Sequence, residues 1–341
     1  MHKILVTGGT GYIGSHTITD LIDHGFDVVS VDNHVKSDPV ILKRLEEICG
    51  KPIKNYPIDL KELDKLSQVF IENPDISGII HFAAYKSVPE SVEFPLDYYE
   101  NNLLSLMNLL RCVDSFAIPY FIFSSSCSIY GNVESLPVTE KSPIAIPESP
   151  YANTKKIGEE IIDDFCKNSD CSAIKLRYFN PVGAHKSIKI GELPVDPPMN
   201  LVPRITQTAA GLLDTFYITG TDYDTRDGTC IRDYLHVMDI ANAHTKSLEY
   251  LLKEGKKGKT EVFNIGSGTG YTVLEIINAF QEASGMKLNY KTADRRAGDV
   301  VAIYADSNKA KEKLGWSAER SLREMLFSAW KWQEEITKLQ P

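Results

Sequence analysis

Residues 3–16 read KILVTGGTGYIGSH, and this stretch decides the fold class. An apolar run typical of a short buried strand leads into Gly8, Gly11 and Gly14, and then into a pattern typical of a helix. Glycines at this spacing permit a tight turn, and they let backbone N–H groups approach a pyrophosphate at the helix N-terminus. Many glycine-rich turns hold nothing, so the surrounding sequence has to decide.

The second predicted strand, residues 27–32, ends at Asp32, about 20 residues beyond the glycines. A carboxylate there accepts hydrogen bonds from the adenosine ribose hydroxyls and repels a 2′-phosphate. The sequence therefore predicts a dinucleotide site that prefers NAD to NADP. The alternative is an ordinary strand-to-helix turn followed by a surface aspartate.

Apolar runs alternate with helical stretches along the first half of the chain. The further apolar runs are at 78–83, 120–125 and 172–179, and the helical stretches at 12–24, 61–72, 96–116 and 151–168. This alternation predicts an α/β protein with a Rossmann-type, doubly wound parallel sheet. From about residue 180, closely spaced prolines mark a change. We expect an NAD-binding domain at 1–179, with a return of the chain at about 235–265, and one further strand at 261–266. A smaller, interleaved substrate-binding domain is expected at 180–234 and 266–341.

Tyr151 and Lys155 form Y-x-x-x-K at the start of a predicted helix, one turn apart on one face. We expect the Lys155 ammonium and a bound nicotinamide to lower the phenol pKa of Tyr151, so that tyrosinate acts as a base. Ser126 follows an apolar strand, where ligands of parallel sheets collect, and is a candidate proton relay. Taken singly, Y-x-x-x-K is common on solvated helices, and serines often cap turns. The conjunction of these features, in this order, favours a hydride-transfer enzyme.

On these motifs the sequence resembles the extended short-chain dehydrogenase/reductase superfamily, and within it the UDP-glucose (UDP-galactose) 4-epimerases. The resemblance covers nearly the whole chain, through TGGTGYIGSHT, HFAAYKSVPESVEFPLDYYENN, FIFSSSCSIYG, SPYANTK, LRYFNPVGAH, DGTCIRDYLHVMD, NIGSG and RRAGDV. It implies interconversion of UDP-glucose and UDP-galactose by oxidation and re-reduction at sugar C4.

The resemblance also implies the site residues. Tyr151 is the base, Lys155 contacts the nicotinamide ribose and Ser126 is the relay; all three also contact NAD, and Ser126 and Tyr151 contact the sugar. The other cofactor contacts are Gly8, Gly11, Tyr12, Ile13, Gly14, Asp32, Asn33, Asp59, Leu60, Phe82, Ala83, Ala84, Lys86, Asn101 and Phe179. The other substrate contacts are Lys86, Asn180, Asn200, Leu201, Arg232, Arg296, Asp299 and Ile303.

Three positions bear on specificity. The family usually has glycine where Ala84 stands and glutamate where Ala297 stands, and neither change removes a catalytic group. Ile303 matches a position against the sugar pocket, where a bulky side chain excludes N-acetylated sugars and a small one admits them. Isoleucine is stiff and intermediate in volume, so we expect weak turnover of UDP-N-acetylglucosamine. Alternatively, Ile303 is only a strand residue.

Related activities remain to be separated. Nucleotide-sugar 4,6-dehydratases that resemble this chain carry an Asp-Glu pair where Cys127 and Ser128 stand here, which disfavours dehydration. A decarboxylase, or a 4-epimerase of another UDP-sugar, is the enzymatic alternative. An NAD-sensing regulatory protein is the non-enzymatic one, but such a protein would be expected to have lost Tyr151 or Lys155.

The composition and charge of the 341-residue chain limit the classes of partner that it is expected to bind. A formal net charge of −9 disfavours nucleic acid as a partner. No signal-peptide pattern and no membrane-spanning apolar run is found, which favours a cytoplasmic protein without a membrane partner. The six cysteines lack C-x-x-C pairs and are expected to be reduced thiols, and no metal-ligand spacing occurs. The family resemblance implies a homodimer joined through the helices near 96–116 and 151–168.

Overall fold

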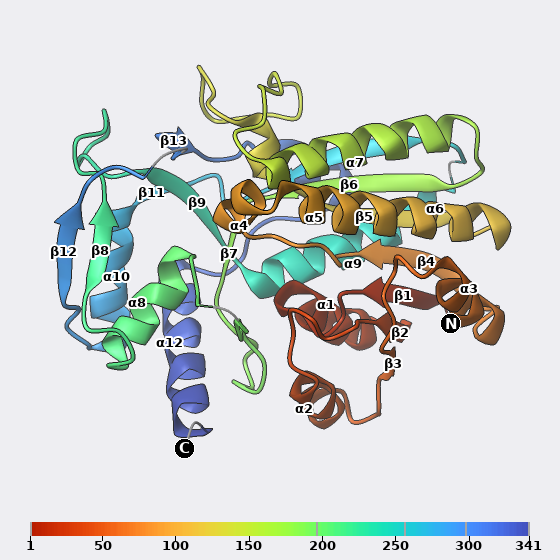
Figure 1. Cartoon of the computed structure of the whole chain (residues 1–341), viewed down its shortest axis with the longest axis horizontal. Helices are drawn as coiled ribbons and strands as arrows, with labels where there is room; N and C mark the ends of the chain where they lie inside the picture. The colour runs from red at the N-terminus through yellow and green to blue at the C-terminus, as the bar shows by residue number, and fades with distance from the viewer. Residues whose placement is uncertain (1, 196, 256, 297–298, 340–341) are drawn as a thin grey trace.

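A seven-stranded parallel sheet organises the first part of the chain, in a computed structural model that describes residues 2–195, 197–255, 257–296 and 299–339 (Figure 1). The strand order is β10-β6-β5-β4-β1-β2-β3, and every neighbouring pair is parallel. This order confirms the Rossmann-type fold class. The strands are β1 (Lys3–Thr7), β2 (Asp27–Val31), β3 (Lys54–Tyr56), β4 (Ile76–His81), β5 (Tyr120–Ser126), β6 (Ser172–Tyr178) and β10 (Thr260–Ile265).

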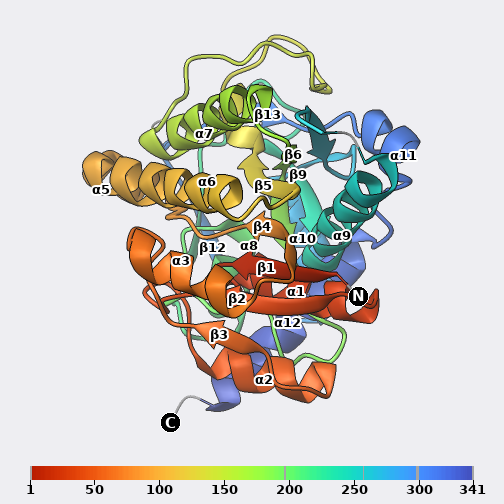
Figure 2. The ribbon, with the colours of Figure 1, turned by 90° about the vertical axis from the view of Figure 1, so that its right-hand side faces the viewer.

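Helices cover both faces of this sheet, as Figures 1 and 2 show. On one face, α1 (Tyr12–Asp23), α2 (Val40–Cys49), α9 (Val237–Glu254) and α11 (Asn308–Leu314) pack over Ile4 and Val6 of β1. On the other, α3 (Leu63–Glu72), α6 (Ser105–Ser115) and α7 (Pro150–Lys167) pack over Leu5. Because alternate side chains of a strand point to opposite faces, β1 contributes to both cores.

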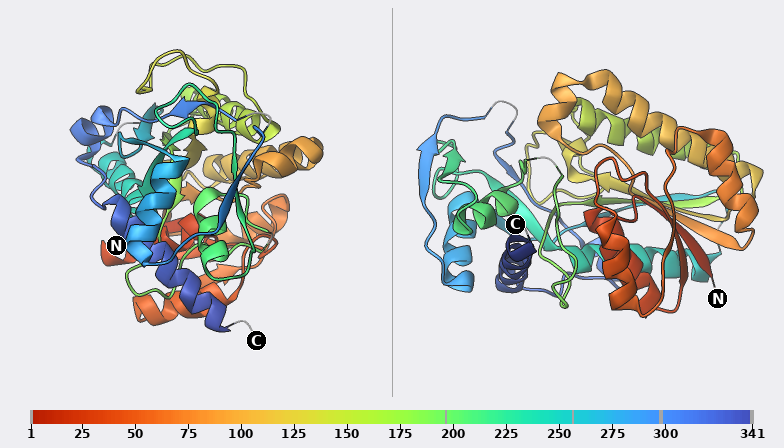
Figure 3. Two further views of the ribbon diagram at one scale, coloured as in Figure 1. Left: turned by 90° about the vertical axis from the view of Figure 1, so that its left-hand side faces the viewer. Right: turned by 60° about the horizontal axis from the view of Figure 1, so that its bottom comes forward.

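The second part of the chain lies at the carboxyl ends of these strands, away from the N-terminus (Figure 3). It contains two smaller sheets: β7 (Asn180–Val182), β9 (Ile231–His236), β11 (Gly270–Thr272) and β13 (Ala302–Ile303) form one, and β8 (Phe216–Thr219) pairs with β12 (Tyr290–Ala293) in the other. Its helices α8 (Leu201–Ala209), α10 (Val273–Ser284) and α12 (Leu322–Leu339) share a separate apolar core. Within the described residues, no helix is long and apolar enough to cross a membrane.

The expected elements are present, with bounds that differ by up to two residues in most cases. The expected helix at 96–116 is instead divided into α5 (Pro95–Tyr99), the π-helical turn η1 (Glu100–Leu104) and α6, preceded by the short helix α4 (Val88–Glu93). Helices α2 and α9 and strand β3 were not predicted. The strand expected at 261–266 is β10, which joins the edge of the large sheet beside β6. The domain boundaries at residues 179, 234 and 265 stay a prediction.

Candidate functional site

The glycine turn between β1 and α1 is closed to larger residues. Gly8 has a φ of +69°, and a Cβ on it would lie 2.9 Å from the backbone nitrogen of Ala83. A Cβ on Gly14 would lie 2.1 Å from the Gly8 carbonyl oxygen, and one on Gly11 3.1 Å from the same atom. No side chain caps the N-terminus of α1. The turn therefore presents backbone N–H groups at a helix N-terminus, the arrangement that binds a pyrophosphate.

Asp32, directly after β2, is held rigidly beside this turn. Its carboxylate accepts hydrogen bonds from the backbone N–H groups of Thr10 at 3.0 Å and His34 at 2.9 Å, and from the Ser37 hydroxyl at 2.9 Å. Two carboxylate oxygens have about four acceptor positions, so one position is left for a ribose hydroxyl. The glycine turn and this carboxylate together fit an NAD-type dinucleotide.

The other proposed cofactor residues follow neighbouring strands at the same edge of the sheet. Most of these side chains are partly exposed there, but Leu60 and Phe179 are buried and therefore offer mainly packing or backbone contact. These proposed cofactor residues are Tyr12 and Ile13 after β1, Asn33 after β2, Asp59 and Leu60 after β3, Phe82, Ala83, Ala84 and Lys86 after β4, Phe179 after β6, and Asn101 in η1. Because parallel strands end at one edge, these residues lie around one site. The π-helical turn that carries Asn101 is a feature often found at functional sites.

Helix α7 brings the proposed catalytic residues together against the end of β5. Ser149 caps the helix by accepting from the Ala152 N–H, which places Tyr151 in the first turn. The Lys155 ammonium donates to the Ser124 carbonyl at 2.7 Å and lies 6.0 Å from the centre of the Tyr151 ring. The Ser126 side chain lies close enough to the Tyr151 phenol to lower its pKa. The base, the relay and the lysine predicted from sequence are therefore neighbours.

The protein surroundings of Tyr151 act on the pKa of its phenol in both directions. Burial raises the pKa of its phenol above the ordinary value, Tyr178 raises it further, and the nearby Ser126 side chain lowers it. Lys155 is itself fully enclosed, and burial lowers its pKa to about 8. The lowering of the phenol pKa that we expect from Lys155 together with a bound nicotinamide stays a prediction.

Two of the proposed substrate contacts, Arg232 and Arg296, meet at a third, Asp299. The Arg296 guanidinium donates to its Oδ1 at 2.6 Å, and an Arg232 nitrogen lies 4.0 Å from the same oxygen. Arg232 is on β9, directly opposite Ile303 in β13. Asn180 begins β7, which also pairs with β9. Two guanidinium groups at one place suit a diphosphate.

Ile303 lies in the apolar cluster formed with Tyr130, Val138, Phe179 and Ala305, and only 4% of it is exposed. This burial gives it a packing role, whatever it contributes to sugar selection. The departure at Ala297 lies outside the described residues.

Glu192 was missed by the sequence analysis, although it joins two proposed site residues. Its carboxylate accepts from the Lys86 ammonium and from the Asn200 amide, each at 3.1 Å. Asn200 is the N-cap of α8, which begins at Leu201, so Glu192 links the strand end after β4 to the second part of the chain. A single glutamate in an irregular, proline-rich segment carries no periodic signal that would have identified it.

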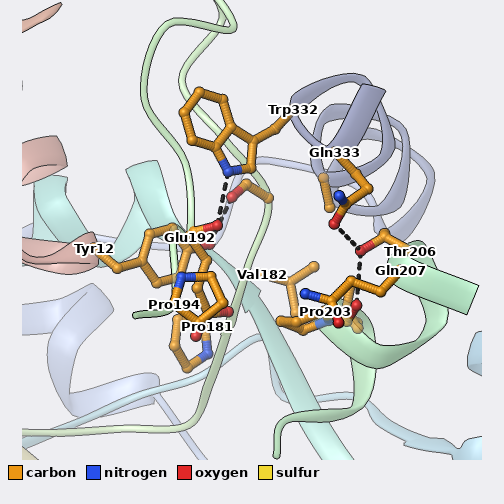
Figure 4. Close-up of a pocket in the computed structure, with 13 residues that line it drawn as sticks. Tyr12, Pro181, Val182, Glu192, Pro194, Pro203, Thr206, Gln207, Trp332 and Gln333 are labelled. Carbon is orange, nitrogen blue, oxygen red and sulfur yellow. Dashed lines mark hydrogen bonds between the residues drawn. The ribbon is translucent and has the colours of Figure 1, made fainter. Parts of the chain in front are cut away.

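Figure 4 shows a narrow pocket beside Glu192, lined also by Tyr12, Pro181 and Val202. The Trp332 indole donates to the Glu192 backbone carbonyl at 2.7 Å and closes one side. The pocket's ≈ 20 Å³ is about the space of a single water molecule. Ser126, Tyr151 and Lys155 do not line it, so it is not the proposed reaction site. No metal-binding group of three or more His, Cys, Asp or Glu side chains occurs among the described residues.

Comparison with known proteins gives consistent results. Residues 5–328 match the family described as GDP-mannose 4,6 dehydratase. UDP-glucose 4-epimerase of Bacillus subtilis is 44% identical over 331 residues, which is 97% of this chain and 96% of that protein. The crystal structure of UDP-glucose 4-epimerase from Bifidobacterium longum in complex with NAD+ and UDP superposes with a TM-score of 0.93, at 43% identity over 98% of both chains. The enzyme from Stenotrophomonas maltophila, with bound NAD and formylated UDP-arabinopyranose, has a TM-score of 0.96, at 38% identity over 99% of this chain and 100% of that one.

Proposed function

Because the chain belongs to the UDP-glucose 4-epimerases, we propose that it interconverts UDP-glucose and UDP-galactose with bound NAD. The observation that carries this proposal is the meeting of Ser126, Tyr151 and Lys155 at the sheet edge that also holds the glycine turn and Asp32. When bound, NAD supplies the redox chemistry, since it accepts a hydride from sugar C4 and returns it.

The residues of the chain move the proton and hold the substrate. Tyr151 takes the proton of the C4 hydroxyl, with Ser126 as hydrogen-bonding relay, and gives it back when the sugar is reduced again. Since burial raises the pKa of Tyr151, the positive charges of Lys155 and of the oxidised cofactor have to offset that burial before tyrosinate forms.

The proposed reaction requires strong binding of the nucleotide and weak binding of the sugar. In our proposal Arg232 and Arg296 hold the diphosphate, and Asp299 holds a ribose hydroxyl. The 4-keto sugar must turn its other face to the cofactor between the two hydride transfers. Strong contacts to the nucleotide and weak contacts to the sugar allow this turn, because a tightly held sugar would stay on one face.

Cys127 supports the choice of epimerisation over dehydration. It stands where the related dehydratases carry an acid, and burial raises the pKa of its thiol to about 12. A thiol with that pKa is a poor proton donor at neutral pH. Among the alternatives, another UDP-sugar keeps specific support, because the similar Stenotrophomonas maltophila structure contains a UDP-arabinopyranose derivative.

We further propose that the protein is a cytoplasmic homodimer joined through the helices near 96–116 and 151–168. Exposed apolar side chains beside and within the first of these segments, among them Phe94, Leu96 and Met107, support this surface. All six cysteines are free thiols, which suits a reducing compartment. Light scattering of the purified protein tests the dimer: a monomeric mass at micromolar concentration would contradict it.

The direct test is to incubate the purified protein with UDP-galactose, with no NAD added, and to separate the products by chromatography. We expect UDP-glucose to form. Parallel incubations with UDP-glucuronate and with UDP-arabinose test the alternative substrates, and faster turnover of either would replace the hexose assignment. Absence of turnover with all three, in protein shown to contain NAD, would contradict epimerisation.

A further inference from the structure

Three polar residues of α7, spaced one helical turn apart, lie against three consecutive serines at the end of β5. Tyr151 lies near Ser126, whose side chain lowers the phenol pKa, and the Lys155 ammonium donates to the Ser124 carbonyl. The third residue, Glu159, accepts from the Ser125 hydroxyl at 2.5 Å. Residues four apart lie on one face of a helix, so Glu159 continues the row that begins with the catalytic pair.

Glu159 is a buried charge with a fixed partner. Its carboxylate accepts from the Arg177 guanidinium at 2.9 Å from Nε and 2.6 Å from a terminal nitrogen, and about 5% of each side chain is exposed. Arg177 is on β6, in register with Ser125 on β5, and it also donates to the Tyr130 hydroxyl at 3.0 Å. Such a two-point ion pair has little positional freedom.

The charge of Glu159 also acts on Lys155. Burial lowers the pKa of the Lys155 ammonium, and the Glu159 carboxylate opposes this by raising it. Among the residues that the structure describes, no other charged group raises the Lys155 pKa in this way. Burial keeps His81 on β4 neutral, with a pKa lowered to about 3, and burial raises the pKa values of Tyr151 and Tyr178. Arg177 is positive and is paired with Glu159 itself.

We infer that Glu159 is a positioning residue for the reaction proposed above: it keeps Lys155 charged beside Tyr151 and holds the serine run against α7. Glu159 acts through Lys155 and Ser125, and it lies one helical turn after Lys155 on α7. This inference rests on the proposed function for its activity readout, but the charge state of Lys155 is measurable without turnover.

The test is Glu159→Gln, which keeps the size of the side chain and a hydrogen-bond acceptor but removes the charge. We expect the loss of activity at alkaline pH to begin at lower pH than in the wild type, by about one pH unit, because an opposite charge at close range shifts a pKa by about one to three units. Lysine side-chain NMR, with the Lys155 signal assigned from Lys155→Arg, should show the same downward shift of its pKa.

Asp163→Asn is the matched control. Asp163 is one further turn along α7 and pairs with Lys175 of β6 at 2.6 Å, so it is the same kind of helix-to-strand ion pair. We expect its pH profile and its Lys155 titration to equal those of the wild type. A uniform loss of activity in Glu159→Gln, with an unshifted pH profile and an unshifted Lys155 titration, would overturn the inference.

If Glu159→Gln fails to fold because Arg177 is left unpaired, Glu159→Gln combined with Arg177→Met removes both buried charges. The Lys155 titration should still move to lower pH in that double variant, and an unmoved titration would overturn the inference. The two proposals fail differently. If the wild type does not convert any UDP-sugar but Lys155 responds to Glu159 as expected, the proposed function is wrong and the positioning role stands.

Discussion

Gly14→Ala should separate cofactor retention from folding. The added Cβ would lie 2.1 Å from the Gly8 carbonyl oxygen, so α1 or the turn must move by about 1.3 Å to reach 3.4 Å, where ordinary contact begins. Neither gives way easily, because Gly8 donates to the Val31 carbonyl at 2.8 Å and Gly11 donates to the Gly8 carbonyl at 3.0 Å. Overpacking of this kind costs about 1–3 kcal/mol, and the better helix propensity of alanine recovers less than ~1 kcal/mol.

If this cost is felt at the pyrophosphate site, affinity for NAD falls by roughly 5- to 150-fold. The assay is the NAD released from denatured protein per mole of chain, together with thermal unfolding. Gly78→Ala is the control, because its Cβ would meet the ends of the Ile4 and Leu248 side chains at 3.2 and 3.3 Å and the Tyr120 Cβ at an ordinary contact distance of 3.6 Å. Wild-type NAD content and affinity in Gly14→Ala would refute the role assigned to the turn.

Tyr151→Phe should keep the fold and bound NAD while turnover falls by on the order of 10² to 10⁴, and near-normal turnover would remove Tyr151 from the mechanism. Steady-state reaction should accumulate no NADH, and NADP should bind more weakly than NAD because of Asp32; a stoichiometric rise in NADH absorbance, or equal affinity for NADP, would contradict these assignments. Ile303→Ser should raise relative activity on UDP-N-acetylglucosamine and lower the free energy of unfolding by about 2–5 kcal/mol, as other large-to-small changes in cores do. Ile303→Val is the mild control. An unchanged sugar preference would mean that Ile303 is a core residue only. Burial lowers the pKa values of His16, His81 and His236 to about 3. The unfolded chain therefore binds more protons than the folded one between about pH 6.5 and 3. Stability should fall as the pH drops through that range, by about 1.4 kcal/mol per pH unit for each fully buried histidine. A melting temperature unchanged from pH 7 to pH 5 would contradict that sign.

The large sheet was predictable because its strands are buried on both faces and read as continuous apolar runs, as in ILV after Lys3. Segment α2 gave a weaker signal, since only Ile41 and Leu45 of its ten residues are buried. The division of the 96–116 helix depends on the π-helical turn at Glu100–Leu104, and no local pattern in the sequence marks a π turn.

The candidate site was predictable where chemistry is tied to a strand end or a helix turn, as for Asp32, Ser126 and the Tyr151–Lys155 pair. The site was not predictable where a property of a side chain, such as its pKa, depends on how deeply that side chain is buried. The pKa of Tyr151 is raised by burial, which the sequence does not report. Glu192 and Glu159 look like ordinary surface glutamates in the sequence, and only the fold brings Lys86 and Arg177 to them.

The place of β10 at the edge of the large sheet has a consequence for synthesis on the ribosome. Strand β6 ends at Tyr178, but the strand that covers its free edge begins only at Thr260. At about 5–20 residues per second, a nascent chain waits roughly 4–16 s before β10 emerges. During that time the N–H and C=O groups along β6 are open to pairing with another chain. Slow translation of the intervening segment would therefore lengthen the period in which the nascent protein is prone to aggregate.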